Sequence, residues 1–174
     1  MEKERLSGMD SNARILTNLE RRTLEAFAER IFPKTESPGA IEIGAVDYIE
    51  IALAGDYAAL LPLYRAGLRA LNRHAKVKRG GQFARLDGQQ QDPILKDFES
   101  GATEFKKAAE FFDMVKYHVF EGLFCEPHYG GNKNMEGWRV VGFPGQQWGY
   151  PDPYINKPVD IEPVAVDYTK AEMK

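Results

Sequence analysis

Residues 124–154 read FCEPHYGGNKNMEGWRVVGFPGQQWGYPDPY and combine Gly and Pro with both tryptophans, two phenylalanines and three tyrosines of the chain. Clusters of Gly, Pro, Asn and Asp interrupt regular structure, so no long helix fits here. Disordered segments are poor in aromatic residues, whereas this one is rich in them. We therefore expect an ordered irregular segment, whose rings pack on the preceding helices, on a partner protein, or on both. Loops of this length are usually functional.

The residues before this segment predict an all-α fold. Thr17 followed by Glu20 forms a capping box at the start of a first helix, which ends before Pro33. Leu24, Phe27 and Ala28 recur at helical spacing on one buried stripe. Further helices are predicted over residues 41–54, from 61 to the basic run at 76–81, from Asp87 or Asp92 up to Gly101, and over residues 103–124.

We thus expect an irregular bundle of about five helices, followed by a long irregular Gly/Pro/aromatic C-terminal segment. The predicted parts are a mobile N-terminus (1–15), a helical domain (16–125), and an irregular partner-binding segment with a C-terminal tail (126–174). No pattern is strong enough for a sheet, and residues 140–143, VVGF, are the one short run typical of a strand.

Bulk composition excludes several classes of function. A net charge of -3 argues against a nucleic-acid-binding surface, and no apolar run approaches the length of a membrane-spanning helix. The single cysteine, Cys125, rules out an internal disulfide framework. No secretion signal is visible, because Arg21 and Arg22 precede a charged amphipathic run rather than an apolar one.

The irregular segment also carries a recognisable set of motifs. They are EGLFCEPHYGGN at 121–132, Gly137-Trp138, GFPG at 142–145 and Gly149-Tyr150. In these residues, and more weakly back to about Leu16, the chain resembles the gluconate 2-dehydrogenase subunit 3 family. Members of that family are small subunits of gluconate 2-dehydrogenase, and are also found with sugar and glucoside dehydrogenases.

The resemblance implies a non-catalytic subunit that contains no cofactor of its own. Its partner would be a large FAD-dependent subunit of the glucose–methanol–choline oxidoreductase type, often joined by a cytochrome c subunit that carries haem. The small subunit would stabilise, mature or export the large flavoprotein in the periplasm. Family members often begin with a twin-arginine signal, so the lack of a visible signal departs from the family pattern.

Aromatic residues of the segment are the candidate partner interface, because tryptophan and tyrosine dominate binding hot spots. The alternative is that these rings cover the chain's own core. The full candidate set is Phe124, Pro127, His128, Tyr129, Trp138, Phe143, Pro144, Trp148, Tyr150 and Tyr154.

Two other functions stay open from the sequence. His118, Cys125 and His128 are residue types that bind zinc, which would suit a stand-alone metal-dependent enzyme, although their spacing matches no tight motif. Their structural interpretation is a buried thiol and two hydrogen-bonded histidines, while His74 is predicted at the surface. The glycine clusters fit no nucleotide-binding loop.

The third hypothesis is that the chain is a transient export chaperone for the large subunit.

Overall fold

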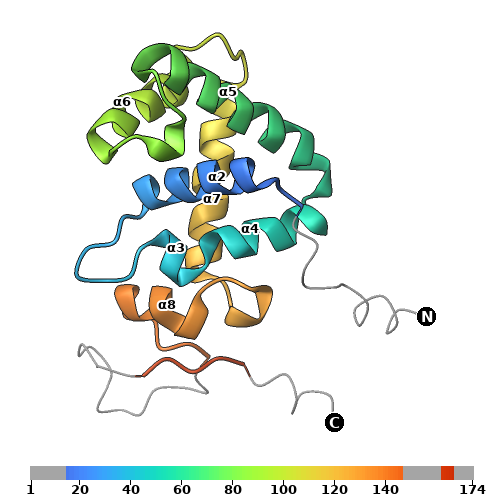
Figure 1. The fold of residues 1–174 in the computed structure, drawn as a ribbon. Coiled ribbons are helices and arrows are strands. Elements are labelled where there is room, and N and C mark those ends of the chain that lie inside the picture. The colour runs from blue at the N-terminus through green and yellow to red at the C-terminus, as the bar shows by residue number, and fades with distance from the viewer. Residues whose placement is uncertain (1–14, 147–161, 167–174) are drawn as a thin grey trace.

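Helix α7 (Ala108–Phe124) runs through the middle of the molecule, behind α2 and α4 as seen in Figure 1. Helices α5 and α6 lie at its N-terminal end and α8 lies at its C-terminal end. This computed structural model describes residues 15–146 and 162–166. Over these residues the fold is all-α, as predicted, and a single isolated bridge between Gly145 and Val164 is the only β pairing.

The described residues contain seven α-helices and four short 3-10 turns. The α-helices are α2 (Asn18–Ile31), α3 (Ala40–Ile43), α4 (Ala45–Ala54), α5 (Leu61–Arg79), α6 (Gly88–Glu99), α7 (Ala108–Phe124) and α8 (Glu136–Val141). The turns are η1 (Ala58–Leu60), η2 (Phe83–Arg85), η3 (Pro127–Tyr129) and η4 (Lys133–Met135).

Local end signals place three helices where the sequence predicted them. The Thr17 hydroxyl accepts a hydrogen bond from Glu20 N, and the Glu20 carboxylate accepts one from Thr17 N, which completes the capping box of α2. Helix α5 has proline in its first turn and ends at Gly80 in the left-handed conformation. Asp87 caps α6, so the earlier of its two predicted starts is correct.

The predicted helix over residues 41–54 is instead two helices that meet at Gly44. Gly44 has φ 89°, a left-handed conformation that ends one helix before the next begins. The stem of Lys133 lies against this turn, and a Cβ on Gly44 would lie only 2.8 Å from Lys133 Cε. The turn at Gly44 therefore contacts the C-terminal segment through Lys133.

The last long helix begins at Ala108, later than the predicted start at Thr103. The Thr103 hydroxyl accepts a hydrogen bond from Phe105 N at 3.1 Å, so residues 103–105 form a local turn. Such bonds from a side chain to nearby backbone compete with helix formation. Phe105 still packs against the core from this turn.

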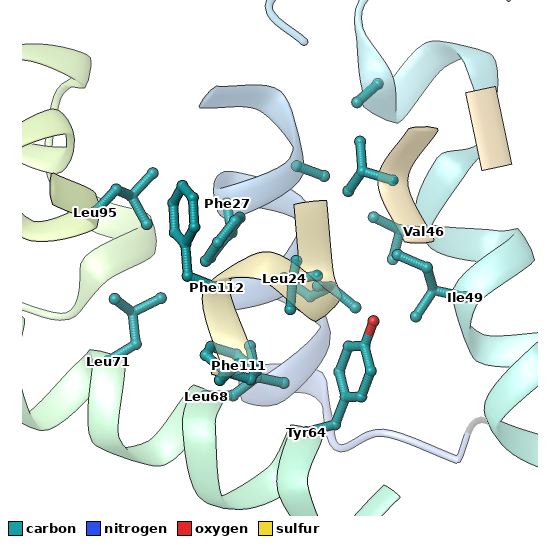
Figure 2. Close-up of a cluster of buried hydrophobic side chains, with 14 of the residues drawn as sticks. Leu24, Phe27, Val46, Ile49, Tyr64, Leu68, Leu71, Leu95, Phe111 and Phe112 are labelled. Carbon is teal, nitrogen blue, oxygen red and sulfur yellow. The ribbon is translucent and has the colours of Figure 1, made fainter. Parts of the chain in front are cut away.

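The hydrophobic core gathers around Phe111 of α7 (Figure 2). Its ring contacts the rings of Phe27, Tyr64 and Phe98 edge-on, with centroid distances of 6.1, 6.0 and 6.2 Å. A Cβ on Gly67 would lie 2.3 Å from the Phe111 ring. Helices α5 and α7 therefore approach closely because position 67 has no side chain.

Candidate partner interface

Asn132 holds the C-terminal segment on the end of α7. Its side chain is fully buried and makes two hydrogen bonds, from Nδ2 to Cys125 O at 2.8 Å and from Gly137 N to Oδ1 at 2.9 Å. Its backbone N–H donates to Gly122 O at 2.8 Å. Helix ends leave carbonyl and N–H groups without intrahelical partners. One asparagine thus joins such carbonyls of α7 to an N–H in the first turn of α8.

Two glycines allow this close approach. A Cβ on Gly131 would lie 2.3 Å from Gly122 O, and a Cβ on Gly137 would lie 1.8 Å from Leu123 O. Neither position accepts any other residue without moving the backbone. The GGN and GW motifs of the sequence are therefore needed to seat the segment on the bundle.

Trp138 packs within its own chain. It is only 5% exposed, its indole N–H donates to Phe124 O at 2.8 Å, and its ring meets Phe143 edge-on at 5.1 Å. It belongs to α8, where residues 140 and 141 also lie. The expectation of a strand-like run at 140–143 is therefore wrong, because Gly142 ends a helix there.

The other candidate interface residues divide by exposure. His128, Tyr129 and Phe143 are exposed, whereas Phe124, Pro127 and Pro144 are partly buried. Trp148, Tyr150 and Tyr154 lie outside the described residues. Partner contact by this set stays a prediction, and Phe143 is placed to cover Trp138 on one side and face outward on the other.

Glu126 holds residues 162–166, the last described residues of the chain, against η3. Its carboxylate accepts hydrogen bonds from His128 N at 3.0 Å and from Val166 N at 2.8 Å. Burial alone would raise the pKa of Glu126, but these backbone bonds and His128 lower it below its usual range. The carboxylate therefore stays charged while it joins η3 to residues 162–166.

An ion-pair network also holds the C-terminal segment on the bundle, through Lys133 of η4. Lys133 pairs with Asp47, which also accepts from Arg21 at 2.6 Å, and Arg21 pairs in turn with Glu50. Burial tends to raise the pKa of Asp47, but the Lys133 and Arg21 bonds lower it. The network joins η4, α4 and α2.

The second half of α7 presents an aromatic surface, of which sequence analysis identified only Phe124. We call Tyr117, Phe120, Glu121 and Phe124 the α7 aromatic face. Tyr117 is 63% exposed and Phe120 is 41% exposed, and the Phe120 and Phe124 rings stack at 6.2 Å. The available clue was that residues 117–124, YHVFEGLF, are apolar on almost every side of the helix, which indicates contacts beyond one buried stripe.

A cluster of tyrosines surrounds Glu121. Its carboxylate accepts hydrogen bonds from the hydroxyls of Tyr48 and Tyr57, each at 3.2 Å. The Tyr57 ring also stacks on His118 at 4.6 Å. Burial, and then the charge of Glu121, raise the pKa of both tyrosines, so they remain neutral donors.

The family model described as gluconate 2-dehydrogenase subunit 3 matches residues 18–145, which include the seven described α-helices and the Asn132 junction. The chain belongs to the gluconate 2-dehydrogenase subunit 3 family. Comparisons with curated proteins and with solved structures find no match. Across the described residues of this subunit 3 protein, no helix has the length and apolar character needed to cross a membrane.

The three candidate metal ligands of this subunit 3 protein do not come together in one site. His118 is buried, with Nδ1 2.8 Å from the Tyr64 hydroxyl, while His128 contacts Glu126 at 3.0 Å. The Cys125 thiol faces Gly122 O at 3.7 Å. Residues 15–146 and 162–166 contain no group of three His, Cys, Asp or Glu side chains arranged to bind a metal.

We expect Cys125 to react slowly with alkylating reagents. Burial raises the pKa of the Cys125 thiol to about 11. Because the thiolate is the reactive form and an ordinary thiol has a pKa of about 8.5, alkylation at pH 8 should be roughly 200-fold slower than for an exposed cysteine. The measurement is the rate of iodoacetamide modification against pH, followed by intact mass. The same chain unfolded in guanidinium is the control, and equal rates in both states would contradict the prediction.

A hollow of about 830 Å³ lies at the other end of the molecule, between α5 and residues 101–105. Three of its basic residues face acids: His74 contacts Asp97 at 2.8 Å, Lys78 lies 3.9 Å from Asp97, and Arg69 lies 3.5 Å from Glu20. His74, predicted at the surface, is partly buried: it lines this hollow with its side chain 13% exposed. The exposed aromatic residues of this subunit 3 protein lie at the α8 end of the molecule, away from this hollow.

Proposed function

We propose that the chain is the non-catalytic small subunit of a periplasmic FAD-dependent sugar dehydrogenase complex. The large partner carries FAD and oxidises a gluconate-, glucose- or glucoside-type sugar, and a cytochrome c subunit with haem is a further partner. This chain supports the stability, maturation or export of the large subunit. The observation that carries the proposal is the family match over residues 18–145.

Two features of the structure support a binding role. His118 is buried in the core with Nδ1 on the Tyr64 hydroxyl, out of reach of a substrate. Burial lowers the pKa of His118, which keeps its ring neutral within the core. At the same time, Tyr117, Phe120 and Phe143 leave aromatic surface exposed at the α8 end. Exposed apolar patches commonly mark interaction surfaces.

Co-expression with the FAD-dependent large subunit encoded by the same genome tests the proposal. We expect the large subunit to co-purify with the tagged small subunit in stoichiometric amount, with flavin absorbance and sugar-dependent dye reduction. Omitting the small subunit should lower the soluble yield of active flavoprotein. The small subunit alone should be colourless and inactive.

Three outcomes would contradict this assignment. Flavin bound to the isolated chain, or sugar oxidation by it, would make it a catalytic protein. One equivalent of zinc or iron that disappears in Cys125→Ser would favour the metal-dependent enzyme. A large subunit that becomes active only with this chain present during synthesis, yet never co-purifies with it, would favour the transient export chaperone.

A further inference from the structure

We propose that the α7 aromatic face binds the large subunit through an arginine of that subunit, which pairs with Glu121. This inference rests on the proposed function and specifies the surface and the chemistry of recognition. It concerns Tyr117, Phe120, Glu121 and Phe124 of α7, together with Tyr48 and Tyr57, which hold the carboxylate.

Glu121 is a half-buried carboxylate whose charge is not balanced within the described chain. Its hydrogen-bond donors are two neutral hydroxyls, and no lysine or arginine of the described residues lies within ion-pair distance of it. The neighbouring acids differ, because Asp47 pairs with Arg21 and Lys133. A carboxylate has about four lone-pair sites, so Glu121 keeps acceptor capacity for a cation.

The residues around Glu121 favour contact with a partner protein over exposure to solvent. Tyr117 and Phe120 expose large rings beside Glu121, and residues 117–132 contain neither lysine nor arginine. A protein that covers these rings also removes water from the carboxylate. Burying an unpaired charge is strongly unfavourable, so the covering surface must bring a cation.

The rings favour arginine over lysine. The exposed ring of Tyr117 lies four residues before Glu121 on α7, a spacing that places both side chains on one face of the helix, and Phe120 exposes a second ring on that face. A planar guanidinium stacks on aromatic rings and binds a carboxylate through two parallel hydrogen bonds.

The test compares two isosteric charge removals on one helix. Glu121→Gln removes the proposed pairing charge, whereas Asp113→Asn removes a charge that is 70% exposed and 3.4 Å from Lys116. Binding of each variant to the FAD-dependent large subunit is measured at several salt concentrations. We expect Glu121→Gln to weaken binding at least about tenfold and to flatten its salt dependence, while Asp113→Asn changes binding less than about twofold.

Melting temperatures of the isolated variants separate a binding role from a structural one. Glutamine still accepts from Tyr48 and Tyr57, so we expect Glu121→Gln to melt within a few degrees of the unmodified chain. Alanine replacement of individual arginines on the large subunit should then identify one whose effect is not additive with Glu121→Gln.

The outcomes distinguish the two proposals. If the unmodified chain does not bind the large subunit, the proposed function fails. If it binds and Glu121→Gln behaves like Asp113→Asn, only the arginine pairing is wrong. Weaker binding with an unchanged salt dependence and a lowered melting temperature would assign Glu121 a purely structural role and also overturn the inference.

Discussion

Gly137→Ala is expected to lower the free energy of unfolding by more than about 3 kcal/mol, among the largest effects of a single substitution. The new Cβ would lie 1.8 Å from Leu123 O, and this backbone atom cannot rotate away as a side chain would. The Asn132 hydrogen bond to Gly137 N would be lost with the displaced turn. Denaturant unfolding of the isolated chain, followed by circular dichroism, measures the change.

Gly142→Ala is the matched control at the other end of α8. Its Cβ would meet no atom within 4 Å, and its only penalty is a φ of 66°. A left-handed conformation costs an alanine roughly 1–2 kcal/mol. If the two variants lose equal stability, the close approach at Gly137 does not hold the segment in place.

Phe111→Ala should cost about 3–5 kcal/mol of folding stability. The substitution removes a fully buried ring that contacts three other rings, and it opens a cavity against Gly67. The same denaturant experiment measures the loss. Helical content under native conditions should fall only if the remaining stability is exhausted.

Tyr117→Ala provides the comparison on the opposite side of α7. Because this ring is 63% exposed, its removal should cost less than about 1 kcal/mol of stability. The proposed interface predicts that it nevertheless weakens binding to the large subunit. Equal loss of stability in the Phe111 and Tyr117 variants would mean that both faces of α7 are core.

Helix ends that depend on neighbouring residues could be predicted, and those that depend on distant ones could not. Thr17 with Glu20, and Gly80, act within a single turn, so the sequence alone locates those boundaries. Gly44 lies inside an apolar run of helical period, and its left-handed break lies beside the stem of Lys133, a residue distant in the sequence. No local pattern contains that information.

The candidate site was only partly predictable, because it too depends on contacts between residues that are distant in the sequence. Over residues 124–146 the aromatic segment packs in an ordered way, as composition indicated, but composition could not separate rings that cover the chain from rings that face outward. Trp138 covers the chain, while Tyr117 and Phe120 on the preceding helix are exposed. The surroundings of Glu121 were not predictable, because its donors come from α4 and from the turn after it.

The bonds of Asn132 make the placement of residues 132–137 depend on a formed end of α7. Their acceptors, Gly122 O and Cys125 O, belong to the last turn and end of α7, so they reach their positions only when that helix has formed. Loss of the last turn of α7 would therefore also release Trp138, whose indole N–H donates to Phe124 O on the same turn.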